Sequence, residues 1–211
     1  MKKFVNSEEF KQKNKDYYRL EEDYDWIKVT DKIVGLESFF HKTRQRNFLR
    51  QLKSFLQKDQ KVLDAGCGTG LFSRFLPDGS YGIDINPRNL AKARQHAPAI
   101  NFMEADLEQL PFENDSFDLI IITEVIEHFP DPLKLLSELK RVLKTGGVIL
   151  GTVPAKSFIW QLRFLSSTRP REPYHRYYSK KELNDLLKQF FEVDDLKQGN
   201  FFMTMSFVLK K

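Results

Sequence analysis

The chain has 211 residues and a formal net charge of +5, from 34 basic and 29 acidic side chains. This length suits one domain, and nineteen Phe and seven Tyr residues exclude a chain that is disordered as a whole. Cys67 is the one cysteine, which excludes an internal disulfide and a cysteine-based zinc site. No apolar run approaches the roughly 18 residues of a membrane span. We therefore expect a cytoplasmic protein with no transmembrane segment, as a monomer or a homodimer.

The first 60 residues predict two helices. One covers residues 7–20, and the other covers residues 36–58, where Phe48, Leu52 and Phe55 recur at helical spacing. The second helix also carries a basic stripe. Because charged residues usually lie on protein surfaces, we interpret this stripe as a solvated face. The stripe consists of Lys42, Arg46, Arg50 and Lys53. We expect residues 1–40 to form an N-terminal helical cap on a domain that covers residues 41–211.

From residue 61 onwards, short apolar runs alternate with helical stretches. Helices are predicted after Asn86-Pro87 and after Asp131-Pro132, the second of which should end at Thr145-Gly146-Gly147. A further helix is predicted over residues 179–189. The predicted strands cover residues 62–65, 81–85, 100–103, 117–122, 148–153, 191–197 and 201–209. This alternation predicts an α/β fold with a doubly wound, mostly parallel sheet and an antiparallel C-terminal hairpin.

The charge is distributed unevenly along this chain. Residues 62–153 carry a net −5, whereas residues 41–61 carry +6 and residues 154–178 carry +4. Residues 154–178 also hold aromatic side chains and follow the fifth strand, so we expect them to form a lid insertion. Charge bears on partners rather than on fold. An acidic centre suits a cationic ligand, and the basic flanks suit an anionic or amphipathic one.

A glycine-rich loop, Gly66-Cys67-Gly68-Thr69-Gly70, follows the first strand. Its glycines allow a tight turn and let a ligand approach the backbone closely. The spacing departs from a dinucleotide fingerprint, because Leu71 stands at the position of the third glycine, and the Gly-Lys-Ser/Thr of a phosphate-binding loop is absent. The loop by itself is weak evidence, since any tight strand-to-helix turn can use two glycines.

Three carboxylates are predicted beside this loop. Asp84 ends the second strand, where an acidic group can accept both hydroxyls of a ribose. Asp64 precedes the glycines and can either receive a positively charged ligand group or brace the loop. Asp106 follows the third strand and should face the same site. Three carboxylates repel a phosphate-rich cofactor but suit one that carries a sulfonium and an ammonium group.

These motifs resemble those of class I S-adenosylmethionine-dependent methyltransferases. Residues 62–70 resemble the first motif of that family, Gly82-Ile83-Asp84 its ribose-binding position, and Glu104-Ala105-Asp106-Leu107 the pair that reads the adenine. The resemblance covers roughly residues 40–200, with every element in family order. It implies a Rossmann-like seven-stranded sheet, S-adenosyl-L-methionine as cofactor and S-adenosyl-L-homocysteine as product. The cofactor contacts that it implies are Asp64, Gly66, Cys67, Gly68, Gly70, Asp84, Ile85, Asp106, Leu107 and Thr123.

Within that class, residues 124–132 look like the subgroup that contains the ubiquinone and menaquinone biosynthesis methyltransferases. The resemblance implies methyl transfer without defining the acceptor. We expect a small-molecule or lipid/quinone-like acceptor, and O-methylation. His128 is the candidate general base, with Glu127 as the second candidate catalytic residue. The alternative is that His128 only holds its turn through backbone hydrogen bonds.

A second possibility is a divalent metal. Three of the candidate ligands stand at i, i+3 and i+4, and a histidine further along the chain could add a fourth. The set is Glu124, Glu127, His128 and His175. It resembles a constellation of small-RNA 3′-end 2′-O-methyltransferases, although many enzymes of the quinone subgroup show the Glu-His pair without a metal. Our expectation is no metal. A metal-dependent RNA 2′-O-methyltransferase, with nucleic acid as partner, and a catalytically silent S-adenosylmethionine-binding protein stay open as alternatives.

Overall fold

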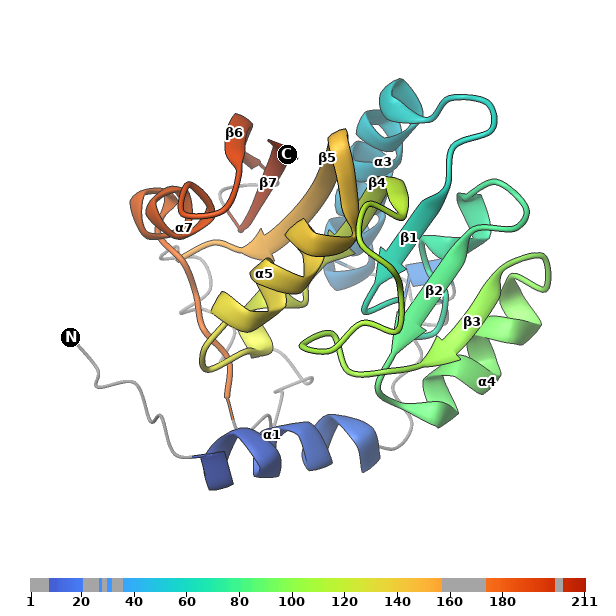
Figure 1. Cartoon of the computed structure of the whole chain (residues 1–211), viewed down its shortest axis with the longest axis horizontal. Coiled ribbons are helices and arrows are strands. Elements are labelled where there is room, and N and C mark those ends of the chain that lie inside the picture. Colours follow the sequence, from blue (N-terminus) through green and yellow to red (C-terminus); the bar gives the residue numbers. More distant parts are fainter. Residues whose placement is uncertain (1–7, 21–26, 28–29, 32–35, 157–173, 200–202) are drawn as a thin grey trace.

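The computed structural model describes residues 8–20, 27, 30–31, 36–156, 174–199 and 203–211 (Figure 1). The described helices are α1 (Glu8–Leu20), α3 (Leu36–Phe55), α4 (Pro87–His96), α5 (Leu133–Val142) and α7 (Lys180–Leu187), with short 3-10 turns η1 (Ser73–Phe75) and η2 (Ile126–His128). The strands are β1 (Val62–Ala65), β2 (Tyr81–Asp84), β3 (Asn101–Glu104), β4 (Phe117–Thr123), β5 (Leu143–Pro154), β6 (Glu192–Gly199) and β7 (Thr204–Lys210). Residues 157–173, which are most of the expected lid, and residues 200–202 of the hairpin turn lie outside the described residues.

The seven strands form one sheet in the order β3-β2-β1-β4-β5-β7-β6. β1 to β5 run parallel, and β7 is antiparallel to both β5 and β6. The predicted doubly wound sheet, with its antiparallel C-terminal hairpin, is therefore confirmed. The strand order reverses between β1 and β4, which is the point where open α/β sheets bind ligands at their carboxyl ends.

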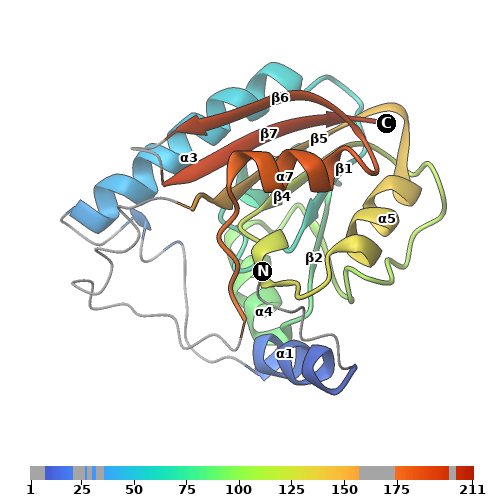
Figure 2. The same cartoon turned by 90° about the vertical axis from the view of Figure 1, so that its left-hand side faces the viewer.

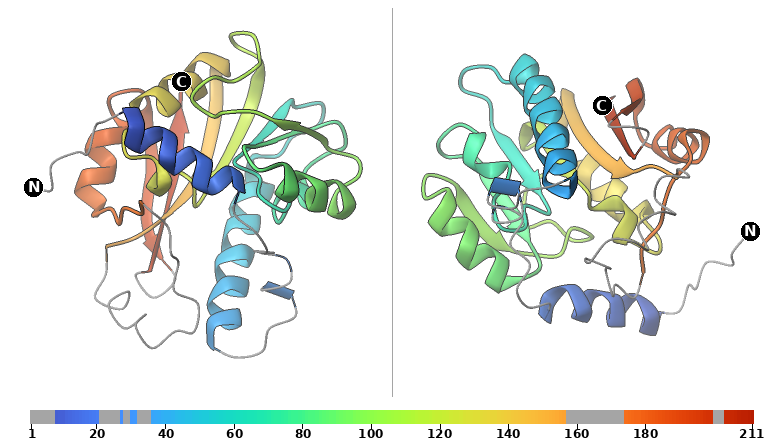
Figure 3. Two further views of the ribbon diagram at one scale, coloured as in Figure 1. Left: turned by 90° about the horizontal axis from the view of Figure 1, so that it is seen from below. Right: turned by 180° about the vertical axis from the view of Figure 1, so that it is seen from behind.

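Helices cover both faces of this sheet (Figure 1 and Figure 3). α3 and α4 lie on one face and share one apolar cluster with it. α5 and α7 lie on the other face and share a second apolar cluster. The central strand β4 serves both clusters, because Leu119 and Ile121 point to the first face and Ile120 and Ile122 to the second. This arrangement explains why the sequence of β4 is continuously apolar.

The largest difference from the expected boundaries is at the start of β5. The helix predicted to end at Thr145-Gly146-Gly147 ends at Val142, and β5 begins at Leu143. β4 pairs Phe117 with Leu143 and then Leu119 with Val148, so the glycine pair lies in an irregular stretch of β5. The reason lies in the tertiary structure. Residues that the sequence pattern assigns to the end of a helix pair with β4 and therefore belong to a strand.

The N-terminal helix α1 lies across the carboxyl ends of the strands rather than on either face (Figure 2 and Figure 3, left). Asn14 is the buried residue of this helix, so α1 contributes little apolar surface to the core. No helix in the described part of the chain has the length and the apolar character needed to span a membrane.

Candidate functional site

The glycine loop after β1 uses its own backbone amides to hold its shape. The amides of Gly66 and Cys67 donate to the carbonyl of Ile83 at 2.8 and 2.9 Å, and the amide of Gly68 donates to Asp84 Oδ2 at 2.8 Å. Phosphate-binding loops instead present such amides to the ligand. The loop is thus tied to the end of β2, and these donors are not available to a phosphate.

Glycine is required in this loop for two physical reasons. Gly66, Gly68 and Gly70 have φ angles of +75°, +52° and +85°, a region that other residues rarely adopt. Space is also limited, because a Cβ atom at Gly66 would lie 2.5 Å from Cγ2 of Val125. The loop therefore packs directly onto the segment that follows β4.

Asp84 stands at the centre of this arrangement. Its Oδ2 accepts the amide of Gly68, and its Oδ1 accepts the amide of Asn86 at 2.8 Å. Burial raises the pKa of Asp84, and these backbone hydrogen bonds act against the increase. Each carboxylate oxygen has a second lone pair. Asp84 can therefore hold the loop and still accept two hydroxyl groups, as a ribose would require.

Asp64 braces the loop rather than facing a ligand. It is 1% exposed, and its Oδ2 accepts a hydrogen bond of 2.6 Å from the hydroxyl of Ser73, in the turn after the loop. Burial raises the pKa of Asp64 to about 7, although the hydrogen bond from Ser73 lowers it. Of the two roles left open for Asp64, the contacts fit the structural one.

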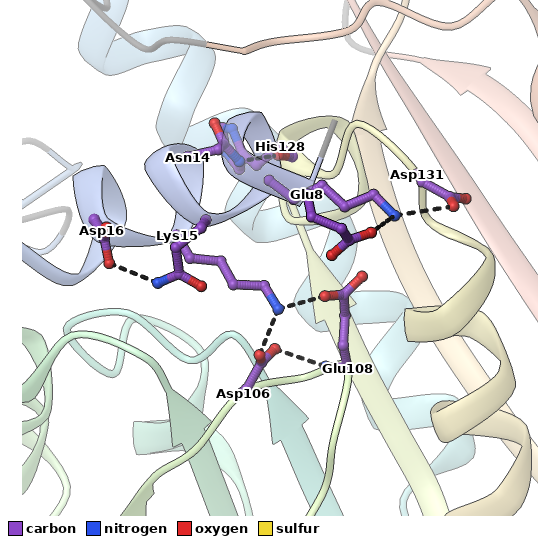
Figure 4. Close-up of polar contacts among 10 residues, drawn as sticks. Glu8, Asn14, Lys15, Asp16, Asp106, Glu108, His128 and Asp131 are labelled. Carbon is purple, nitrogen blue, oxygen red and sulfur yellow. Dashed lines mark hydrogen bonds and ion pairs between the residues drawn. The ribbon is translucent and has the colours of Figure 1, made fainter. Parts of the chain in front are cut away.

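Asp106 is joined to α1 by an ion pair (Figure 4). Lys15 Nζ lies 2.6 Å from Asp106 Oδ2 and 2.5 Å from Oε2 of the buried Glu108. Burial lowers the pKa of the Lys15 ammonium, and its hydrogen bonds to Asp106 and Glu108 outweigh this effect, so the pKa is raised. The side chain expected to read the adenine is thus covered by a cation from the N-terminal helix.

Lys15 belongs to a row of basic residues on α1. Lys11, Lys15 and Arg19 are spaced by four residues and pair with Asp131, with Asp106 and Glu108, and with Glu104. This row was not among the features predicted from the sequence. Its signal was the i, i+4 spacing of three cations, together with the alternating acids 104, 106 and 108 after the third strand.

We expect Lys15→Met to loosen α1. The substitution leaves the buried Glu108 without its cation, and α1 has little apolar packing to compensate. Amide hydrogen exchange in residues 8–20 should accelerate at least about tenfold. Lys13→Met removes an exposed lysine of the same helix and is the control. Equal exchange rates in the two variants would mean that the ion pair does not hold the helix.

His128 lies under the same helix. Its Nδ1 is 2.7 Å from the hydroxyl of Tyr18, and its carbonyl accepts a hydrogen bond of 2.8 Å from Asn14 Nδ2 (Figure 4). Its ring centroid lies 5.3 Å from that of His175. Burial, and then the neighbouring His175, lower the pKa of His128 to about 3. The imidazole is therefore neutral near pH 7, with one ring nitrogen that donates a hydrogen bond and one that accepts.

This low pKa predicts a pH dependence of stability. An unfolded histidine has a pKa near 6.5, so between pH 6.5 and about 3 the unfolded chain binds a proton that folded His128 does not. The free energy of unfolding should accordingly fall as the pH decreases through this range. Asp64 acts in the opposite direction, because its raised pKa removes stability as the pH rises from about 4 to about 7.

Comparison with His128→Gln isolates the histidine contribution. We expect the difference in unfolding free energy between pH 7 and pH 4.5 to be smaller in the variant, by up to about 2 kcal/mol. Urea unfolding at the two pH values measures this difference. His96→Gln, on α4, is the control. A wild-type pH dependence that persists in His128→Gln would show that His128 is not the group responsible.

Two of the four residues of the metal alternative, Glu124 and His128, use their side chains to contact Arg44 and Tyr18. Arg44 of α3 lies 2.8 Å from Glu124 Oε2, and Glu124 has a φ angle of +55°. Glu127 is 1% exposed, and its carbonyl accepts the amide of Arg176 at 3.0 Å. Among the described residues, no group of three or more His, Cys, Asp or Glu side chains is placed to hold a metal ion.

The remaining residues expected at the cofactor site lie around the same edge. Ile85 directly follows β2, Thr123 is the last residue of β4, and Leu107 is 6% exposed in the core beside Asp106. Cys67 is also buried, and burial raises the pKa of its thiol. The expected cofactor residues therefore cluster at the carboxyl ends of β1, β2, β3 and β4.

A doubly wound sheet with a glycine loop and an acidic residue after its second strand defines a Rossmann-like ligand-binding class. Within that class, residues 63–151 match the family model described as a methyltransferase domain. The expected resemblance to S-adenosylmethionine-dependent methyltransferases is therefore confirmed.

Known relatives agree with this assignment. The chain is 33% identical over 168 residues to a probable S-adenosylmethionine-dependent methyltransferase of Mycolicibacterium smegmatis. The aligned region covers 77% of the chain and 64% of the relative. It is 31% identical over 146 residues to a ubiquinone biosynthesis O-methyltransferase of Cereibacter sphaeroides, covering 61% of the chain and 58% of the relative. The chain thus spans about three fifths of the length of these relatives.

A solved structure shows the same fold over almost the whole chain. The magnesium protoporphyrin IX methyltransferase of Synechocystis PCC 6803, determined with bound S-adenosylhomocysteine, superposes with a TM-score of 0.73. The superposition covers 95% of this chain and 99% of that one, at 18% sequence identity. At this identity the comparison supports the fold alone.

Proposed function

We propose that the chain is an S-adenosylmethionine-dependent methyltransferase that acts on a small-molecule or lipid/quinone-like acceptor by O-methylation. The observation that carries the proposal is the Asp84 carboxylate, held by the amides of Gly68 and Asn86 at the carboxyl end of β2, one strand from the switch point of the sheet. The loop amides of Gly66, Cys67 and Gly68 are engaged within the protein, which disfavours a phosphate-rich ligand and suits a cationic one.

The described residues offer what such a donor needs. Asp84 would accept the ribose hydroxyls, Asp106 and Leu107 would face the adenine, and the segment from Gly66 to Gly70 would border the amino-acid end. S-adenosylmethionine supplies an activated methyl group when it is bound. The protein must hold the acceptor in line with that group and exclude water, which is the larger part of catalysis in such a displacement.

His128 would act on the acceptor side, with Glu127 at the buried turn beside it. With α1 lying over it, as in this structure, His128 is a weak base, because burial lowers its pKa to about 3. The hydroxyl of Tyr18 occupies its Nδ1, and Tyr18 comes from α1. A shift of α1 would uncover the ring, restore its hydration and raise its pKa, so that it could accept the proton of a hydroxyl acceptor.

Residues 1–40 would then serve as a cap over the donor and acceptor sites. The contacts of α1 with Asp106 and with His128 support this role, since both residues were expected in the site from sequence. The ubiquinone O-methyltransferase relative supports a hydroxyl of a quinone-like molecule as acceptor. The metal-dependent RNA alternative has less support, because the four expected ligands do not form a group placed to hold a metal ion within the described residues.

The test separates donor binding from methyl transfer. Titration calorimetry with S-adenosylhomocysteine should give micromolar binding, and no heat at millimolar ligand would refute the donor assignment. A cell extract incubated with methyl-labelled donor should yield labelled extractable small molecules. Binding without any labelled product would favour the catalytically silent alternative, and label in RNA that requires a divalent metal would favour the RNA enzyme.

A further inference from the structure

The outer face of α3 carries a row of four exposed cations. They are Lys42, Arg46, Arg50 and Lys53. Their spacing of three or four residues places them on one side of the helix, while Phe48 and Leu52 on the other side are buried in the core. At 1.5 Å per residue the row is about 16 Å long. The row is therefore a linear positive surface on one flank of the sheet.

No carboxylate accompanies this row. The sequence contains no Asp or Glu between residues 38 and 58. The ion pairs of the described residues involve none of the four cations. In contrast, Lys15, Arg141 and Lys181 on other helices each pair with a carboxylate. An ordinary solvated surface mixes both signs of charge, and this row of four cations does not.

The row begins beside the candidate site. Arg44 of α3 pairs with Glu124, which directly follows β4, so the first turns of α3 lie at the carboxyl edge of the sheet. Phe39, in line with the cations and before them in the chain, is 54% exposed. The exposed face of α3 thus combines a large aromatic side chain near the site with four cations that lead away from it.

We propose that this face of α3 binds the surface of an anionic membrane. A row of lysines and arginines with an exposed aromatic residue has the composition of helices that rest on anionic lipid. The four cations would contact the anionic headgroups, and the exposed ring of Phe39 would enter the headgroup layer beside them.

Vesicle sedimentation tests the proposal on the full chain. The probes are vesicles of phosphatidylcholine alone and vesicles with 30% phosphatidylglycerol, at 100 and 500 mM NaCl. The test variant replaces the four α3 cations with glutamine. The matched control replaces four exposed lysines on the opposite side of the sheet, in or beside α5 and α7: Lys134, Lys140, Lys180 and Lys188. Both variants lower the net charge to the same value, and thermal unfolding confirms that each one folds.

We expect the wild type and the control to bind the anionic vesicles at 100 mM NaCl. The α3 variant should partition at least about tenfold less, and the higher salt should release the wild type. Equal losses in the two variants would show a general charge effect and overturn the proposal. So would equal binding of the wild type to both vesicle types. Binding of a single-stranded RNA that the α3 variant alone loses, without vesicle binding, would assign the face to nucleic acid instead.

Discussion

Replacing Asp84 with alanine should weaken the binding of S-adenosylhomocysteine by tenfold to about 100-fold. The substitution removes the proposed acceptor for two ribose hydroxyls and releases the amides of Gly68 and Asn86. Hydrogen bonds to a charged group of this kind contribute about 1–3 kcal/mol. Titration calorimetry measures the affinity. Asp84→Asn keeps one oxygen acceptor in the same place and should show an intermediate loss.

A suitable control is Asp118→Ala. Asp118 lies on β4 at the amino end of the sheet and also accepts a backbone amide, from Lys61, together with the ammonium of Lys144. It should lower stability without changing the affinity for the product. If Asp84→Ala binds S-adenosylhomocysteine as tightly as the wild type does, Asp84 is not the ribose acceptor.

Gly66→Ala should destabilise the fold by about 2–4 kcal/mol and weaken product binding. The added Cβ atom would lie 2.5 Å from Cγ2 of Val125, and alanine is strained at a φ angle of +75°. Relief of the contact would displace the loop, and the amide of Gly68 would then move away from Asp84. Urea unfolding and calorimetry measure the two effects.

A double-mutant cycle separates the contact from the backbone strain. Val125→Ala removes the opposing methyl groups and has its own packing cost. In Gly66→Ala/Val125→Ala the collision is absent, so the two changes together should cost less than the sum of the single changes. The remaining loss reports the strain of alanine at the left-handed position. Strict additivity would contradict the close contact between this loop and the segment after β4.

Several parts of the fold are predictable because they depend on local patterns. The apolar run at residues 117–122 predicts a strand that is buried on both faces, and Leu119 to Ile122 serve both apolar clusters. The loop from Gly66 to Gly70 predicts a tight turn, which the positive φ angles confirm. Asn86-Pro87 predicts a helix start, and the Asn86 side chain accepts the amides of Arg88 and Asn89.

Other features depend on partners that are distant in the chain. The start of β5 at Leu143 follows from pairing with Phe117, which no local signal near Thr145 reveals. The ion pair of Lys15 with Asp106 and Glu108 joins segments about 90 residues apart in sequence. The pKa of His128 depends on burial beneath Tyr18 and beside His175. Sequence patterns identify the residue types in each case but not the side chains that they meet.

The sequence by itself determined the class of sheet, the glycine loop and the acidic positions at or near the ends of the first three strands, because each depends on residues that are near neighbours in the chain. It also determined the contrast between an acidic centre and basic flanks. Only the tertiary structure decided what those charges do. It paired Lys11, Lys15 and Arg19 of α1 with the acids around the site and left the row of four cations on α3 exposed without carboxylate partners. The distance between charges, and not their number, decides whether they neutralise one another.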